Sequence, residues 1–325
     1  MMKLPFGLIG LLLSAFHISL ISPVWGQTYP AKPLRWIVPT GAGSAVDVTA
    51  RRIAPKLSES LGQPVIVDNR PGANSMIGAR EVARSAPDGY ALFQGVINNA
   101  LNDLVTPDPC CILNEKLVAV TRLISTPLVM VVHPSMPANS VKEYVALAKS
   151  RPNQLTYASG GTGAITQMVG ELLKSTTAIE VREVPYKAIG AELPDLTGGH
   201  VSTAFLASVV IRDHLRSGKL RGLAVAGPER VSIIPDIPTM AEAGFPTVEG
   251  IGWNGIFVPA GTPRAVIDRL QQEIARVLRT KEMQDDAVTM GSQTGGERPD
   301  EFAAFVRSEI RKWGKVIKDA NIKVE

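Results

Sequence analysis

Cysteine is nearly absent from this chain of 325 residues, which contains only the neighbouring pair Cys110 and Cys111. Two adjacent cysteines cannot build a disulfide framework, and they lack the further ligands at regular spacing that a zinc site needs. A strained vicinal disulfide, two buried reduced thiols and a bridge to another chain all stay open for this pair. No metal ion is expected.

Catalytic residue patterns are also scarce. The four histidines, His17, His133, His200 and His214, stand in unrelated contexts, and the chain has no Gly-x-Ser-x-Gly elbow. Hydrolysis needs a nucleophile with a base beside it, and the sequence offers no such pair. We therefore expect a protein that is not an enzyme.

Neither sign of charge dominates the sequence. Lys and Arg number 34 against 30 Asp and Glu, which gives a formal net charge of +4, and no long run of one sign occurs. A nucleic-acid partner or a membrane-surface role is therefore not expected. Although aromatic residues make up only 5%, hydrophobic residues reach 45%, which is enough to bury a core and to build two lobes.

Residues 1–26 differ from the rest of the chain. Lys3 gives a positive start, residues 8–13 form an apolar block, and the stretch Ser22-Pro-Val-Trp-Gly26 supplies a small residue at a plausible cleavage point. This pattern predicts a signal peptide that is cleaved after Gly26 and a soluble, exported mature protein. An uncleaved membrane anchor is the alternative, because the uncharged stretch is nearly long enough to span a bilayer.

From residue 34 onward, strand-like and helix-like segments alternate, which predicts an α/β fold with parallel sheets. Apolar, β-branched runs mark strands at 34–38, 64–68, 90–93 and 128–132, and again at 155–158, 180–184, 201–205, 220–225 and 253–258. The helix after residue 44 is expected to survive Pro55 with a kink. Two long C-terminal helices, with no strand between them, are expected to cover an existing sheet.

A loop of small residues separates the first strand from the first helix. Exposed backbone amides at such a strand-to-helix turn attract anions. Its glycine spacing matches neither the dinucleotide fingerprint nor a Walker loop, so no cofactor is predicted, and an ordinary turn is the alternative. Asp47 is expected either to cap the helix or to contact a ligand. The candidate binding residues of this loop are Pro39, Thr40, Gly41, Ala42, Gly43, Ser44 and Asp47.

A second stretch repeats this design. The strand 155–158 leads into a glycine-rich loop and then into an amphipathic helix, so the two loops could face one another across a cleft. Their hydroxyls and amides could bind a carboxylate without a fixed countercharge. An enzyme that uses Ser159 as a nucleophile is the alternative. The candidates in this second loop are Ser159, Gly160, Thr162, Gly163, Thr166 and Gln167.

Several longer motifs resemble one known family. They are Tyr-Pro-Ala-Lys-Pro-Leu-Arg-Trp-Ile-Val-Pro at 29–39, Leu-Gly-Gln-Pro-Val-Ile-Val-Asp-Asn-Arg-Pro-Gly-Ala at 61–73, Ala-Pro-Asp-Gly-Tyr at 86–90, Val-Pro-Tyr-Lys at 184–187, Asp-Leu-Thr-Gly-Gly-His at 195–200, Pro-Asp-Ile-Pro-Thr at 235–239 and Pro-Ala-Gly-Thr-Pro at 259–263. Together they closely resemble the Bug-type receptors of tripartite tricarboxylate transporters. The resemblance extends over most of the chain after residue 28.

The resemblance implies a two-lobed periplasmic binding protein fold of type II, with two crossover strands between mainly parallel sheets flanked by helices. Residues 27–126 and 252–325 would form lobe 1, and residues 127–251 would form lobe 2. The protein would be a monomer that closes on a small carboxylate and passes it to integral membrane transporter subunits. By the same resemblance, the two loops would grip the ligand, and Asn98 and Ala207 would border the cleft.

Two positions depart from the family pattern. Gln167 stands where many relatives have a histidine, and Leu206 stands where many have an aspartate. The apolar side chains of Val46, Ala164, Ile165 and Met168 could line the cleft, although Ile165 and Met168 fit a core position equally well. We therefore expect an aromatic carboxylate or an aliphatic dicarboxylate in preference to citrate or aspartate. A ligand sensor for signalling would fit the same sequence.

Overall fold

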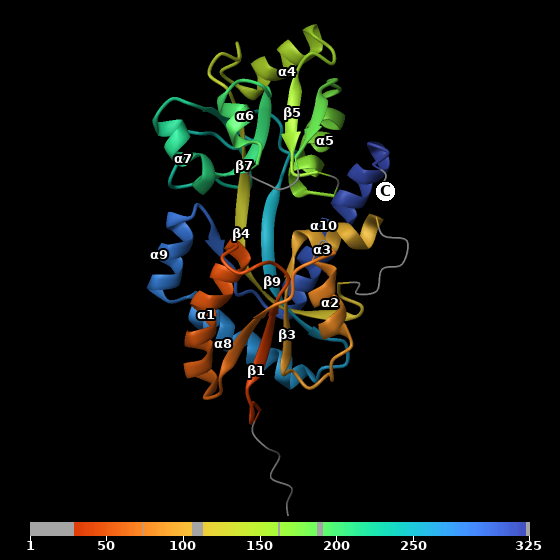
Figure 1. Ribbon diagram of the computed structural model, residues 1–325, viewed down its shortest axis with the longest axis vertical. Coiled ribbons are helices and arrows are strands. Elements are labelled where there is room, and N and C mark those ends of the chain that lie inside the picture. Colours follow the sequence, from red (N-terminus) through yellow and green to blue (C-terminus); the bar gives the residue numbers. More distant parts are fainter. Residues whose placement is uncertain (1–28, 74, 106–112, 162, 187–190, 323–325) are drawn as a thin grey trace, which may run out of the picture.

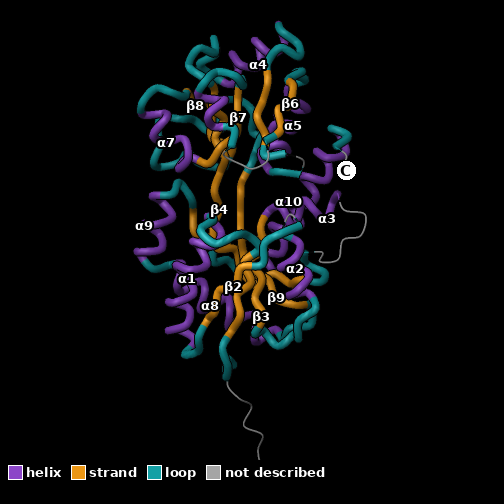
Figure 2. The backbone as a smooth tube through the Cα atoms, in the orientation of Figure 1, coloured by secondary structure: helices purple, strands orange, loops and turns teal. Residues whose placement is uncertain are grey.

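The computed structural model describes residues 29–322, apart from residue 74 and residues 106–112, 162 and 187–190. Figure 1 shows two parts stacked along the longest axis, and the long strands β4 (Leu117–Val132) and β9 (Ile251–Pro259) run between them. Helices flank the strands in both parts, as Figure 2 shows. The predicted α/β fold is confirmed.

The lower part is built around three parallel strands. These are β1 (Leu34–Val38), β2 (Val65–Asn69) and β3 (Ala91–Val96), with β1 in the middle. They are connected by α1 (Ala45–Leu61) and α2 (Met76–Ala83), and α3 (Ile97–Val105) follows β3. Each predicted strand of this part is found within one to three residues at each end.

Helix α1 begins and ends where its sequence demands. Ser44 caps its start, and Gly62, with φ 67°, ends it in the left-handed conformation that glycine adopts without strain. Ile53, Leu57 and Leu61 recur at helical spacing and are buried on one face. The helix continues through Pro55, as predicted, because these buried contacts outweigh the loss of one backbone hydrogen bond.

Strand β4 is much longer than the predicted strand at 128–132. Its first eleven residues pair antiparallel with β9, from Leu117 opposite Pro259 to Pro127 opposite Ile251. This half escaped prediction because polar residues and Pro127 interrupt its apolar pattern. The register with β9 shifts twice, which is how a strand accommodates extra residues.

The upper part repeats the plan of the lower one. Strands β5 (Thr156–Ser159), β6 (Arg182–Pro185) and β7 (Thr203–Ala207) are parallel, with β5 in the middle. Both β7 and β8 (Arg221–Ala226) pair antiparallel with the end of β4. The helices of this part are α4 (Val141–Ser150), α5 (Ile165–Thr177), α6 (Leu193–Thr197) and α7 (Ser208–Arg216).

These pairings fix the direction of every strand. Strands β1 and β3 of the lower part and β5 and β7 of the upper part all end toward the middle of the molecule. Val96, at the end of β3, lies beside Asn254, which pairs with Ile124, whereas Ala207 pairs with Leu128. The two edges are therefore separated by four residues of β4, or roughly 13 Å at about 3.3 Å per residue.

The C-terminal segment contains an element that was not predicted. Between the helices α8 (Arg264–Leu278) and α9 (Lys281–Thr289) and the last helix α10 (Pro299–Asp319) lies the strand β10 (Gln293–Thr294). The expectation of helices without an intervening strand is therefore wrong. Two residues show no periodicity, and β10 exists only because it pairs with β4 at Ser125 and Ile124.

Helix α10 connects the two parts. It contacts α3 in the lower part and α5 in the upper part. Phe302, Val306 and Trp313 of α10 share one buried cluster with Met168 and Val169 of α5. The core is thus continuous between the two parts where α10 packs against α5. The predicted lobe boundaries at 126–127 and 251–252 fall in β4 and at the start of β9, and they stay a prediction.

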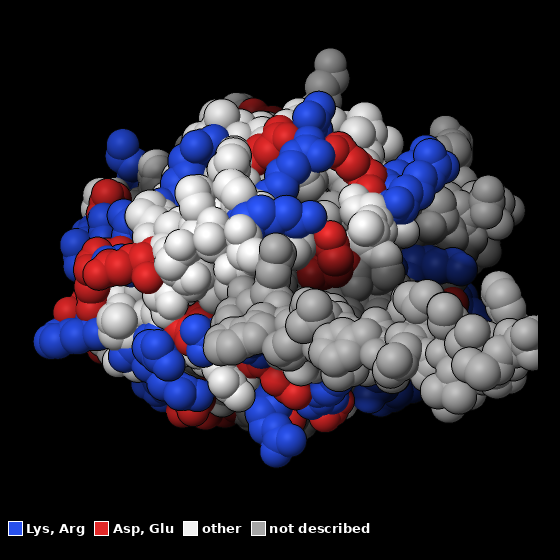
Figure 3. Space-filling model, turned by 90° about the horizontal axis from the view of Figure 1, so that it is seen from below, with Lys and Arg blue, Asp and Glu red and all other residues white. Residues whose placement is uncertain are grey.

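Charged side chains of both signs are mixed on the lower end of the molecule, as Figure 3 shows. The ion pairs of the protein include Arg35 with Asp68 and Arg264 with Asp300. Within the described ranges, no helix combines the length and apolarity needed to cross a bilayer. This face therefore carries no patch of a single sign.

We predict that Gly255→Ala destabilises the protein and that Gly252→Ala, in the same strand, does not. A Cβ at Gly255 would collide with the Phe302 ring and approach the Thr121 carbonyl oxygen to 2.8 Å, whereas at Gly252 the nearest atom is 3.6 Å away. Overpacking of this kind costs about 1–3 kcal/mol. Urea unfolding monitored by circular dichroism measures both variants, and equal stabilities would contradict the packing described for β9.

Candidate functional site

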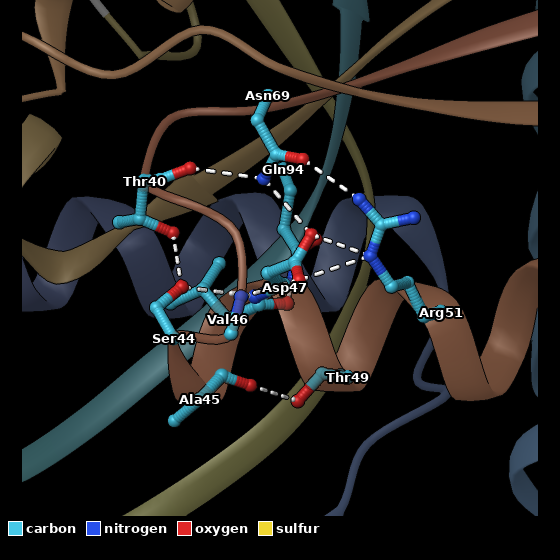
Figure 4. A network of polar contacts seen from close by, with 10 residues as sticks. Thr40, Ser44, Ala45, Val46, Asp47, Thr49, Arg51, Asn69 and Gln94 are labelled. Carbon is cyan, nitrogen blue, oxygen red and sulfur yellow. Dashed lines mark hydrogen bonds and ion pairs between the residues drawn. The ribbon is translucent and has the colours of Figure 1, made fainter.

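The loop between β1 and α1 is held by its own side chains (Figure 4). The Ser44 hydroxyl accepts a hydrogen bond from the Asp47 amide at 3.2 Å and lies 2.6 Å from the Thr40 hydroxyl. Gly41, Ala42 and Gly43 are exposed, whereas Pro39 is buried beneath them. Gly43 has a φ of 82°, a left-handed conformation that glycine adopts readily and other residues rarely do. The predicted small-residue turn is therefore an ordered loop.

Asp47 is the central support of this loop (Figure 4). It is only 2% exposed, and its carboxylate accepts hydrogen bonds from the Gly43 amide at 2.8 Å, from Arg51 Nε at 3.0 Å and from Asn69 Nδ2 at 2.8 Å. Burial by itself would raise the pKa of this carboxyl, but the hydrogen bonds from Arg51, Gly43 and Asn69 lower its pKa below the ordinary value. Direct contact of Asp47 with a ligand stays a prediction.

The loop and the first turn of α1 present free donors. Four backbone amides donate to no acceptor among the described residues; they are those of Gly41, Ala42, Ala45 and Val46. Two of these amides belong to the helix start, where the helix dipole also favours negative charge. The arrangement can therefore hold an anion without a basic side chain, because the nearby Arg51 is already paired with Asp47.

The second loop, between β5 and α5, is held in a related way. The buried Ser159 hydroxyl donates to Glu183 at 2.5 Å and accepts from the Gly161 amide at 3.1 Å. Gln167 accepts from the Gly163 amide at 2.9 Å and donates to the other carboxylate oxygen of Glu183 at 3.1 Å. Ser159 is thus a supporting residue of the loop, because its hydroxyl is bound to the Glu183 carboxylate, which Gln167 also binds.

The two loops are built in the same way, but the carboxylate and the side-chain amide that support them occupy opposite positions. In each, a left-handed glycine donates its amide to a side chain four residues later, which is Asp47 for Gly43 and Gln167 for Gly163. That side chain is in turn bound by a residue of the neighbouring strand. In the first loop the pair is a carboxylate and the Asn69 amide, and in the second it is an amide and a carboxylate.

The expectation of exposed amides in both loops needs correction for the second loop. There the Gly160 amide donates to the Thr166 hydroxyl at 2.8 Å, and the amides of Gly161 and Gly163 are bound as described. The amides without a described acceptor are those of the first turn of α5, at Ile165, Thr166 and Gln167. Thr162, another predicted site residue, lies outside the described residues, as do Cys110 and Cys111.

Two further predicted residues follow strands that end at the middle. Asn98 is half-buried in the first turn of α3, directly after β3. Ala207 is half-buried at the cap of α7, at the end of β7. The neighbouring Asn99 is a structural residue, because it accepts from the Val96 amide at 2.9 Å and donates to the Ser75 carbonyl oxygen at 3.2 Å.

The apolar residues proposed for the cleft wall divide into two groups. Ile165 and Met168 are 3% and 0% exposed and belong to the core cluster that includes residues of α10. Of the two alternatives left open for these residues, the core position is the one found, because α10 covers this face of α5. Ala164 is buried as well, whereas Val46 is half-buried at the start of α1.

Sequence reasoning missed a buried polar network behind the first loop. Gln94 is 0% exposed, accepts from Trp36 Nε1 at 3.0 Å, and donates to the Val46 carbonyl oxygen and to Asn254 Oδ1, both at 3.1 Å. It therefore ties the start of α1 to the crossover strand β9. The available signal was one polar residue in the otherwise apolar run Leu92-Phe93-Gln94.

No candidate metal site is found in the described part of the chain. It contains no group of three or more His, Cys, Asp or Glu side chains that could hold a metal ion. His133 lies 2.7 Å from the Ser135 hydroxyl in an exposed turn, away from both loops in the sequence. The amides described at the first loop and at the start of α1 can donate hydrogen bonds to an anion.

Known proteins resemble the chain over nearly its whole length. A family model described as the tripartite tricarboxylate transporter family receptor matches residues 49–322. Protein BugT of Bordetella pertussis is 33% identical over 320 residues, which are 98% of this chain and 97% of BugT.

Two solved structures of similar proteins contain carboxylates. Rpa4515 of R. palustris with adipate is 31% identical, with a TM-score of 0.77 and coverage of 91% of this chain and 99% of that one. MatC from Rhodopseudomonas palustris with bound malate is 27% identical, with a TM-score of 0.72 and coverage of 89% and 100%.

We predict that Asp47→Asn lowers the free energy of unfolding by about 1–3 kcal/mol, because the amide cannot accept all the hydrogen bonds that the carboxylate accepts. The lowered pKa means that the ionised carboxylate stabilises the fold fully above its ordinary pKa of 3.8 and loses this effect as pH falls through the lower folded value. Urea unfolding at several pH values should therefore show a difference between the two proteins that is constant near neutrality and shrinks below about pH 4. A constant difference down to pH 2 would contradict this role.

Proposed function

Because this chain belongs to the receptor family of tripartite tricarboxylate transporters, a family of periplasmic solute-binding proteins and not of enzymes, we propose that it captures a small carboxylate between the two loops. The observation that carries the proposal is the set of free amides at Gly41, Ala42, Ala45 and Val46. They stand at a helix start that points to the middle of the molecule. A carboxylate is the small anion that the related structures contain.

The second loop would contact the other end of the ligand. Three groups follow strands that end toward the middle: the amides at the start of α5 that have no acceptor among the described residues, and the half-buried residues Asn98 and Ala207. Movement of the two parts toward one another would bring these groups onto a ligand already held by the first loop. Ser159, Thr166 and Gln167 would then act on the ligand indirectly, because their side chains hold the loop in place.

The ligand classes that we propose are an aliphatic dicarboxylate and an aromatic carboxylate. The relatives with adipate and malate support the first class. The second class loses two of its expected apolar contacts, since Ile165 and Met168 are in the core. Citrate would bring a third carboxylate to loops that offer no unpaired basic side chain among the described residues.

The proposed cellular role follows from the family. A signal peptide at residues 1–26 would direct the chain to the periplasm, where the loaded monomer would deliver its ligand to integral membrane subunits of the transporter. The same fold would also serve a sensor that presents bound ligand to a signalling partner. Loss of uptake in a strain lacking this protein is what separates transport from sensing.

We predict that Gly43→Val lowers the affinity for adipate, malate or benzoate by at least about tenfold, measured by isothermal titration calorimetry with citrate as a fourth acid. A β-branched residue at φ 82° is strained, so the loop and its amides must move. Gly218→Val is the matched control, because Gly218 has a φ of 69° and, like Gly43, has no atom within 4 Å of an added Cβ. Gly43→Val that binds as tightly as the unaltered protein would contradict the proposal, as would tight binding of citrate alone.

A further inference from the structure

A groove lies beside the first turn of α1, between this helix and α9, with β4 and β9 as its floor. Its volume is about 80 Å³, which leaves room for several non-hydrogen atoms, since one water needs roughly 10–15 Å³. Most of its walls are apolar. The apolar side chains are those of Ala45, Val46, Val48, Ile124, Met283, Ala287 and Met290.

The groove begins where the proposed carboxylate site ends. Ala45 and Val46 contribute free backbone amides to that site, and the same two residues form part of the groove wall. A ligand whose carboxylate is bound at the start of α1 would therefore have the mouth of the groove beside it. This inference rests on the proposed function, because it needs the carboxylate to be held there.

Among the described residues that line the groove, none carries an unpaired charge. Of the two charged residues that line it, Arg52 of α1 forms an ion pair with Asp286 of α9. A second ion pair, between Lys56 and Glu282 at 2.7 Å, connects the same two helices further along. These two ion pairs hold α1 and α9 together. A second carboxylate of a ligand placed in the groove would lose its water without gaining a countercharge.

The side-chain amide of Asn254, on the floor of the groove, has N–H donors that no described residue uses. Asn254 accepts from Gln94 through its oxygen at 3.1 Å, but its amide nitrogen donates to no group among the described residues. The other side-chain hydroxyls are occupied, because Thr126 and Ser292 bond each other at 2.7 Å and Thr49 donates to the Ala45 carbonyl oxygen at 2.9 Å. The groove therefore offers apolar contact and one neutral donor.

From these contacts we propose that the α1–α9 groove receives the uncharged, apolar body of an aromatic monocarboxylate, with an acceptor on the far side of the ring bound by Asn254. Adipate, with charge at both ends, would instead extend across to the start of α5. The groove thus distinguishes the two ligand classes. Val48 and Asn254 become residues that determine specificity.

The first test fills the groove. Val48→Phe should lower the affinity for benzoate at least about tenfold in isothermal titration calorimetry and leave the affinity for adipate within about twofold. Val210→Phe, at an exposed valine of α7, is the matched control and should change neither affinity. Thermal unfolding of each variant establishes that it is folded.

The second test changes the donor. In the unaltered protein, 4-methoxybenzoate, whose ether oxygen can only accept, should bind more tightly than benzoate. Asn254→Asp keeps an acceptor for Gln94 but replaces the donor with an anionic oxygen, so the preference should reverse by at least about fivefold. Retention of the preference would contradict the role of Asn254.

The outcomes separate this inference from the proposed function. Equal losses for benzoate and adipate in Val48→Phe, no loss for either, or an unaltered protein that binds adipate but no aromatic acid would each overturn the groove assignment alone. Failure of the unaltered protein to bind any of these acids would overturn the proposed function, and the groove assignment with it. A selective loss of benzoate supports both.

Discussion

Strand β4 imposes the geometry on which the site depends. Its first half pairs with β9 and its second half with β7 and β8, all antiparallel, so a single strand sets directions in both parts of the molecule. Strand β9 then orients β3 and β1, and β7 orients β5. Because helices follow the ends of parallel strands, the starts of α1 and α5 both come to the middle. Ligand sites in open α/β sheets lie at such strand ends for the same reason.

The described side chains that support both loops are hydrogen-bonded without a ligand, and this has an energetic consequence. Asp47 and Asn69 hold the first loop, and Gln167 and Glu183 hold the second, through hydrogen bonds that leave each buried polar group with partners. A preorganised loop loses less conformational entropy on binding, so more of the interaction with the ligand appears as affinity. The exchanged positions of carboxylate and amide show that the same geometry can be built from two chemistries.

Local sequence predicted most of the elements but few of the partners. The strand and helix around the first loop follow from a β-branched run, the Ser44 cap and the buried stripe on α1, which are all local signals. The first half of β4 and all of β10 could not be found in this way, because their structure depends on pairing with residues far along the chain. The same holds for Met168, which a local pattern cannot assign to the core or the cleft. Met168 is in the core because it packs against helix α10, which lies more than a hundred residues later in the chain.

The candidate site rests on the same kind of local signal. The small residues of both loops were identified from the sequence, and the repeated strand–loop–helix design led to the expectation that the loops face one another. The supporting residues Asn69, Gln94 and Glu183 were not identified, because each acts through a side-chain contact with a residue at least 16 positions away. Buried polar residues of this kind become recognisable only when the fold brings their partners together.

The central claim is that the backbone amides at the start of α1 bind the ligand carboxylate. The most direct measurement is a titration of the ¹⁵N- and ²H-labelled protein with adipate, followed by amide chemical shifts in two-dimensional NMR spectra. We expect the largest chemical shift changes to include the amides of Gly41, Ala42, Ala45 and Val46. Large shifts confined to other parts of the molecule, with these four amides unchanged at saturation, would contradict this claim.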